Sequence, residues 1–133
     1  MAIHIERLCN TEEWSVFRDD GQGVDEYLHS DGTWHYTTTV DGKSFPGLFP
    51  SEELARKTTL LQVLREGYTI CYAPLSRGLI LLKKDGSRAE AKVQPTMQEF
   101  LSLRSQGLIK HVDTMNQGHH IFHGRVYFYK STD

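Results

Sequence analysis

The chain has 133 residues, 38% of them hydrophobic, and a formal net charge of −2, which is ordinary for one globular domain with its own core. No run approaches the roughly 18 apolar residues of a membrane-spanning helix, and the N-terminus lacks the basic start and apolar run of a signal peptide. The two cysteines, Cys9 and Cys71, lack the spacing of a metal site or of a disulfide framework. This pattern predicts a reducing, cytoplasmic location. A single Cys9–Cys71 disulfide is the alternative.

Charge is divided unevenly along the chain. Residues 1–53 contain 3 basic and 11 acidic side chains, net −8, whereas residues 54–133 contain 12 basic and 6 acidic side chains, net +6. In one interpretation the two parts neutralise each other within the fold or across a dimer; in the other, the basic part binds an anionic partner. We favour the first, because nucleic-acid-binding domains are usually basic overall.

The N-terminal segment predicts a strand over residues 2–8, where isoleucines alternate with polar residues. Residues 10–17 have the spacing of a helix capping box at their start, and both a short helix and a strand fit them. The acidic, glycine-containing segment 18–26 is predicted to be a loop. It lacks the alternating carboxylates and closing glutamate of a calcium-binding loop.

Three Asp-Gly dipeptides, at 31–32, 41–42 and 85–86, lie between runs rich in β-branched and aromatic residues. Asp-Gly in that setting indicates a hairpin with a two-residue turn, in which both residues take positive φ. Short antiparallel strands are therefore predicted on either side of each dipeptide. Further strands are predicted over residues 68–73, 79–84, 87–93, 108–112, 119–122 and 125–130.

Two helices are predicted, over residues 51–66 and 96–106. The first begins with a serine N-cap and two glutamates, whose negative charge suits the positive end of the helix dipole. The second begins with a capping box of Thr96 and Glu99, and a glycine follows each helix at the position of a left-handed cap. The apolar side of the first helix is predicted to consist of Leu54, Leu60, Leu61 and Leu64.

These elements predict a single α+β domain, with a mostly antiparallel meander sheet and both helices packed on one face. The order of strands, Asp-Gly turn, proline, helix and glycine occurs over residues 27–67 and again over 68–107, and residues 108–130 resemble a truncated third unit. An internal duplication is one hypothesis. The alternative, which we favour, is that α+β meanders reuse the same turn and cap residues.

The turn at Asp31-Gly32 positions an aromatic group. A two-residue turn sets His29 opposite Trp34 and Tyr27 opposite Tyr36, and alternate residues of paired strands share one face. The predicted aromatic wall therefore consists of Tyr27, His29, Trp34 and Tyr36. Such a group is commonly a cross-strand cluster buried beneath a helix. The functional interpretation is a stacking surface for a flat ligand or for the side chains of a protein partner.

A basic hairpin is the second candidate site, and its five members are Arg77, Lys83, Lys84, Arg88 and Lys92. A two-residue turn at 85–86 places Lys83, Arg88 and Lys92 on one face, with Glu90 among them. This set favours nucleic-acid binding only weakly, because such surfaces usually interleave aromatic residues. A solvated hairpin face is the simpler interpretation.

No metal, cofactor or catalytic group is predicted. Structural and catalytic zinc need three or four convergent ligands, and the chain contains no His-Glu-x-x-His or Cys-x-x-Cys motif. Cys71 lies in an apolar run typical of an inert buried thiol, and no nucleophile elbow or glycine-rich phosphate loop is present. The seven histidines are His4, His29, His35, His111, His119, His120 and His123.

The sequence thus favours a small, non-catalytic, cytoplasmic binding protein that takes a small molecule or a protein partner on the aromatic wall. Nucleic-acid binding through the basic hairpin is one alternative, and an enzyme whose site is assembled from separated residues is another. A homodimer is also predicted, since a large sheet in a short chain leaves edges to cover. The strands at 2–8 and 125–130 are the candidate edges.

Overall fold

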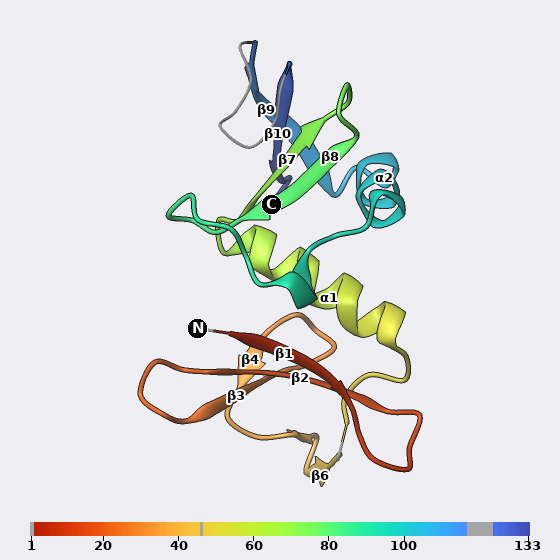
Figure 1. Cartoon of the computed structure of the whole chain (residues 1–133). Helices are drawn as coiled ribbons and strands as arrows, with labels where there is room; N and C mark the ends of the chain where they lie inside the picture. The colour runs from red at the N-terminus through yellow and green to blue at the C-terminus, as the bar shows by residue number, and fades with distance from the viewer. Residues whose placement is uncertain (1, 46, 117–123) are drawn as a thin grey trace. The chain divides into compact units, whose positions relative to one another are not determined.

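The computed structural model describes residues 2–45, 47–116 and 124–133 (Figure 1). It confirms the α+β class, with two α-helices and antiparallel strand pairing throughout the described residues. The strands form two four-stranded sheets and one two-stranded sheet instead of joining one meander. The chain divides into two compact units, Met1–Gln62 and Val63–Asp133, and each contains one of the four-stranded sheets.

The first sheet is a meander in the order β1-β2-β3-β4. Its strands are β1 (Ile3–Arg7), β2 (Trp14–Asp19), β3 (Asp25–Leu28) and β4 (Trp34–His35). The strand predicted at 2–8 is confirmed, and residues 14–19 form a strand and not a helix. The acidic segment is a hairpin turn in which Asp19 Oδ1 accepts from the Gly21 amide and Asp20 Oδ1 accepts from the Gln22 amide. The carboxylates thus close the turn.

One face of this sheet supplies the core of the first unit. Ile3, Val16 and Leu28 are buried, and the strand register places them on the same face. Successive side chains of a strand point to opposite faces, so Phe17 and Tyr27 lie on the other face, where both are half-buried. The face with Ile3, Val16 and Leu28 therefore supplies the core, and the face with Phe17 and Tyr27 is partly accessible.

The turn at Asp31-Gly32 has three residues, not two. The His29 amide donates to the Thr33 carbonyl over 2.9 Å, and the Gly32 amide donates to the His29 carbonyl over 2.9 Å. Ser30, Asp31 and Gly32 form the loop, and only the glycine has positive φ (86°). This is the hairpin that combines a type I turn with a left-handed glycine. The predicted register is consequently wrong by one residue.

Another hairpin follows the first sheet, and its turn matches the prediction. Strands β5 (Thr39–Val40) and β6 (Lys43–Ser44) flank Asp41 and Gly42, whose φ angles are 50° and 79°. Val40 pairs with Lys43, which leaves a two-residue turn with both φ angles positive.

Helix α1 spans Glu52–Arg65. The Ser51 hydroxyl accepts from the Leu54 amide over 3.2 Å, which confirms the predicted N-cap. Leu54 itself is 40% exposed, so the predicted leucine stripe is wrong at its first position. The buried positions follow helical spacing one residue later and are Ala55, Thr59, Leu60, Val63 and Leu64.

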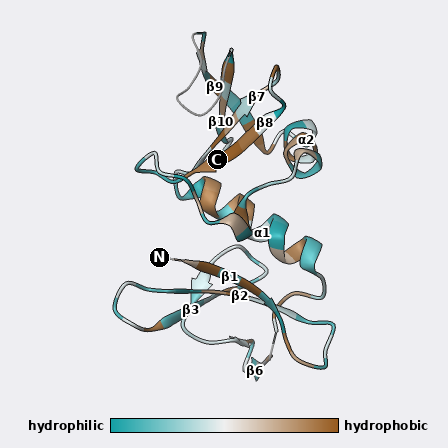
Figure 2. Cartoon of the chain, in the orientation of Figure 1, coloured by the Kyte–Doolittle hydropathy of each residue, from teal (hydrophilic) through white to brown (hydrophobic). Residues whose placement is uncertain are grey.

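The second sheet has the order β8-β7-β10-β9. Its strands are β7 (Thr69–Ala73), β8 (Gly78–Leu82), β9 (Ile109–Met115) and β10 (Val126–Ser131). β8 is hydrophobic along most of its length in Figure 2. The C-terminal strand predicted at 125–130 is thus an inner strand, which corrects its assignment as a free edge. The strand predicted at 119–122 lies outside the described residues.

Helix α2 (Met97–Ser105) covers one face of the second sheet. The predicted capping box is confirmed: the Thr96 hydroxyl accepts from the Glu99 amide, and the Glu99 carboxylate accepts from the Thr96 amide. Phe100 is fully buried, and its ring centroid lies 5.0 Å from those of Tyr72 and Tyr129. These aromatic contacts hold the helix on strands β7 and β10.

The segment after β8 departs from its predicted strand. Arg88 makes only an isolated bridge with Leu82, and residues Ala91–Val93 form a short 3₁₀ helix, η1. The side chain of Gln94 then takes the place of a pairing strand. Its Oε1 accepts from the Leu81 amide over 2.7 Å, and its Nε2 donates to the Leu81 carbonyl over 3.1 Å and to the Ala89 carbonyl over 2.8 Å.

Among the described residues, no helix is long and apolar enough to cross a membrane. Both cysteines are free thiols, with Cys9 exposed and Cys71 buried, so the alternative of a Cys9–Cys71 disulfide is not realised.

Candidate functional site

The accessible face of the first sheet carries a line of rings, one from each strand. His4 pairs with Phe17, Phe17 pairs with Tyr27, and Tyr27 pairs with His35. The rings of His4 and Phe17 are stacked, with centroids 5.0 Å apart and planes at 20°, and those of Phe17 and Tyr27 are 6.1 Å apart. We call His4, Phe17, Tyr27 and His35 the imidazole–aromatic row.

The row is partly open to solvent. His4, Phe17 and Tyr27 are half-buried, and His35 is exposed. The fully buried hydrophobic residues Ile3, Val16 and Leu28 lie on the opposite face, so the four rings are not the centre of the core, although Ser15 and His29 are buried on the face of the row. Half-buried aromatic rings present an apolar face together with polar edges, which is the chemistry that protein interfaces favour.

His29 adds a second imidazole at one end of the row. Its ring centroid lies 4.0 Å from that of His35. His29 Nε2 lies 2.7 Å from the Thr37 carbonyl, and because a carbonyl only accepts, this nitrogen carries the hydrogen. Thr33 Oγ1 donates to Asp31 Oδ1 over 2.6 Å, so His35 Nε2, at 2.6 Å from the same hydroxyl, is the donor. In the neutral rings, each Nδ1 is therefore an acceptor.

Asp31 anchors this end of the row. The Thr33 hydroxyl and amide both donate to its carboxylate, and they hold the pKa of Asp31 below its ordinary value of 3.8. The neighbouring imidazoles of His35 and His29 lower this pKa further. A negative charge is thus fixed beside the two histidines at ordinary pH.

The structure brings together two of the four residues of the predicted aromatic wall. Tyr27 and His29 share the face of the row. Trp34 pairs with Leu28 and lies on the opposite face, where the Arg18 guanidinium carbon is 4.0 Å from its ring centroid. Tyr36 is 61% exposed, and its hydroxyl hydrogen-bonds to Asp20, which raises the pKa of Tyr36.

Sequence reasoning missed three members of the row, His4, Phe17 and His35. The first two follow from the alternation in β1 and β2 once both segments are recognised as paired strands. His35 requires the correct turn length, because a shift of one residue moves every side chain of β4 to the other face.

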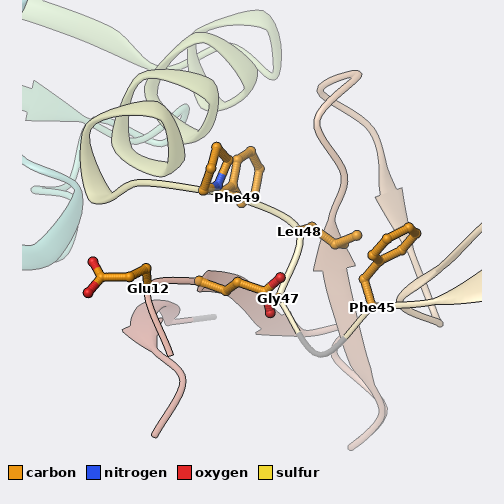
Figure 3. Close-up of a pocket in the computed structure, with 7 residues that line it drawn as sticks. Glu12, Phe45, Gly47, Leu48 and Phe49 are labelled. Carbon is orange, nitrogen blue, oxygen red and sulfur yellow. The ribbon is translucent and has the colours of Figure 1, made fainter. Parts of the chain in front are cut away.

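The first unit also contains a pocket of about 300 Å³ at the start of β2 (Figure 3). Its walls are mainly apolar, with two carboxylates beside them. The lining residues are Glu12, Glu13, Phe45, Gly47, Leu48, Phe49 and Pro50. Leu48 is half-buried, whereas Phe45 is 38% exposed at the rim.

Backbone pairing with β2 forms the floor of this pocket. The Trp14 amide donates to the Phe49 carbonyl over 2.8 Å, and the Phe49 amide donates to the Trp14 carbonyl over 3.1 Å. Gly47 is buried and packed tightly: a Cβ atom there would lie 2.8 Å from Glu13 Cβ and 3.1 Å from the Trp14 carbonyl oxygen. The segment can approach β2 this closely only because residue 47 has no side chain.

The members of the basic hairpin do not form the predicted face. The Lys83 amide donates to the Ser87 carbonyl over 2.7 Å, so this turn also has three residues and the predicted pairing of Lys83 with Arg88 is wrong. Lys83 Nζ lies 3.3 Å from Glu90, which raises the pKa of Lys83. The other four are exposed, and Lys92 lies in η1 instead of opposite Leu79; these residues are Arg77, Lys84, Arg88 and Lys92.

Within the described ranges, no group of three or more histidine, cysteine, aspartate or glutamate side chains is arranged to hold a metal ion. His119, His120 and His123 lie outside those ranges. No protein-family model, curated protein or solved structure matches the chain. The first unit thus carries two candidate binding sites, the imidazole–aromatic row and the pocket.

Proposed function

We propose that the chain is a non-catalytic binding module that takes a protein partner on the imidazole–aromatic row. The observation that carries this proposal is the alignment of four rings, one from each strand, on the accessible face of the first sheet. The rings of His4, Phe17 and Tyr27, at spacings of 5.0 and 6.1 Å, offer aromatic surface for the side chains of a partner.

The shape of the row favours a protein partner over a small molecule. Small molecules bind mostly in concave pockets that bury most of their surface. The row lies on the face of an open four-stranded sheet, with His35 exposed at one end. A protein partner covers such a surface by laying several side chains across it.

The alternative of nucleic-acid binding has less support, because Glu90 pairs with the only half-buried lysine of the basic hairpin, Lys83. The proposed location is the cytoplasm, since both free thiols suit a reducing compartment.

The test uses peptides selected for binding to the intact chain from a random peptide library. We expect Tyr27→Ala to lower the affinity for the selected peptides about tenfold or more. A tenfold loss corresponds to roughly 1.4 kcal/mol of binding free energy. The matched control is Tyr127→Ala, which removes a half-buried tyrosine from the second sheet. Binding should respond little to added salt, whereas phosphate-type recognition falls steeply. Equal weakening by both variants, or no effect of Tyr27→Ala in a folded protein, contradicts the proposal.

We also propose that two copies pair through β1, the strand at one edge of the first sheet. Antiparallel pairing centred on Ile5 sets His4 opposite Glu6 of the second copy, so each imidazole can donate a hydrogen bond to a carboxylate across the pair. Light scattering at tens of micromolar should give the mass of a dimer. Glu6→Lys, which removes the acceptor opposite His4, should give a monomer; a monomeric wild-type protein contradicts this pairing.

A further inference from the structure

We propose that the pocket at the start of β2 binds a lysine or arginine side chain of a protein partner. The pocket is separate from the imidazole–aromatic row, since none of its lining residues belongs to the row.

The apolar walls fit the stem of a long side chain. Phe45, Leu48, Phe49 and Pro50 supply aromatic and aliphatic surface, and the volume of about 300 Å³ accommodates one long side chain. Lysine and arginine bury their methylene stems against such surfaces while their charged ends stay near solvent or a carboxylate. Phe45, 38% exposed, also presents an aromatic ring to a cation.

The two glutamates bring negative charge to the pocket, although the Glu12 carboxylate points away from Leu48 and Phe45 in Figure 3. Glu12 is exposed, Glu13 is half-buried, and both line the pocket. Among the ion pairs found between described residues, none involves either carboxylate. The first unit as a whole contains five basic and eleven acidic side chains, net −6, so its field attracts a cation and repels an anion.

The pocket is also held in place before any ligand arrives. Two backbone hydrogen bonds between Trp14 and Phe49 hold the floor. The close packing of Gly47 on Glu13 and on the Trp14 carbonyl holds the same segment against β2. A rigid site saves the cost of ordering its walls on binding, which favours recognition of a single side chain.

The experiment compares two probe peptides that differ only in charge. Acetyl-Gly-Lys-Gly-amide carries an ammonium on its stem, and acetyl-Gly-norleucine-Gly-amide carries a stem of similar length without charge. Each is titrated into the full chain, and backbone amide shifts of residues 12–14 and 47–49 are followed by NMR. We expect the lysine peptide to bind about tenfold more tightly than the norleucine peptide.

Two variants separate the roles of charge and stem. The double variant Glu12→Gln, Glu13→Gln should lower the affinity of the lysine peptide to that of the norleucine peptide. Leu48→Ala should lower the affinity of both peptides. The matched control is Asp25→Asn with Asp41→Asn, which removes two exposed negative charges of the same unit outside the pocket. The control should retain the tenfold preference. Equal affinities of the two peptides for the wild type, or equal loss in the control, overturns the proposal.

Discussion

Asp31 and Thr33 are joined by two hydrogen bonds to the same carboxylate oxygen, from the Thr33 amide over 2.9 Å and from its hydroxyl over 2.6 Å. Asp85 and Ser87 repeat this arrangement, also at 2.9 and 2.6 Å. Both pairs occur in three-residue turns. Asp41 is followed two positions later by Lys43, which has no hydroxyl, and there the turn has two residues. We infer that Asp-Gly-Ser/Thr selects the longer turn in this chain.

The first prediction concerns the pKa of Asp31. Thr33→Val removes the hydroxyl donor, which is the largest cause of the lowered pKa, and should move that pKa upward toward 3.8. The side-chain carboxyl resonance of Asp31 in an NMR pH titration measures the change. Ser87→Ala should act in the same way on Asp85, whose pKa is lowered chiefly by the Ser87 hydroxyl. An unchanged titration of Asp31 in Thr33→Val contradicts the assigned cause.

The same shift predicts a pH dependence of stability. Folding lowers the pKa of Asp31 below its unfolded value, so the folded state binds fewer protons than the unfolded state in the interval between them. The stabilisation from this carboxylate is fully present above about pH 4 and is lost as the pH falls through the folded pKa. In Asp31→Asn, the free energy of unfolding measured with urea should therefore fall less steeply as the pH is lowered below about 4.

The second prediction concerns Gln94. Gln94→Leu keeps the size of the side chain but leaves the Leu81 amide, which is paired by Gln94 Oε1, without that acceptor. Leaving a buried donor unsatisfied costs about 1–3 kcal/mol, and urea unfolding should show a loss of that size. The control is Gln98→Leu on the exposed side of α2, which should change the free energy of unfolding little. If Gln94→Leu leaves the free energy of unfolding unchanged, the hydrogen bonds of the Gln94 side chain do not stabilise the fold.

The third prediction concerns the thiols. Cys71 is fully buried, and this burial raises the pKa of its thiol to about 11. Cys9 is exposed. Because the thiolate is the reactive form, the native chain should react with one equivalent of an aromatic disulfide reagent at pH 8, and the unfolded chain with two. Rapid reaction of both thiols in the native state excludes this arrangement of β7.

The fourth prediction concerns Gly47. Its substitution by alanine places a Cβ 2.8 Å from Glu13 Cβ, closer than packed carbon atoms approach, so the segment that forms the pocket floor must shift. Overpacking of this kind costs about 1–3 kcal/mol. Urea unfolding should show the loss, and the amide shifts of residues 48 and 49 should move. An alanine variant as stable as the wild type indicates a looser pocket.

Sequence patterns predicted the elements whose signals are local. The capping box of Thr96 and Glu99 and the serine cap of α1 are present as predicted, because each depends on residues within one helical turn. The strand at β1 follows from alternation in the same way. The division of the strands between two sheets depends on contacts between distant segments, and the sequence spacing did not reveal it.

The wrong length predicted for one turn changed which residues were assigned to the aromatic wall. The prediction placed Trp34 opposite His29 because it assumed a two-residue turn, and the third loop residue moves Trp34 to the other face. The presence of Thr33 after Asp31-Gly32 was the signal for the longer loop. The pocket had no comparable signal, since it forms where the segment at Phe49 pairs with the distant Trp14.

The direct test of the account is a measurement of which rings share a face of the first sheet, by nuclear Overhauser effects between side-chain protons. The row predicts contacts of Phe17 with His4 and with Tyr27, together with contacts of the Trp34 indole with the Arg18 side chain. Contacts of the Trp34 indole with the Tyr27 ring and absence of the Phe17–Tyr27 contact would contradict the register, and with it the proposed binding surface.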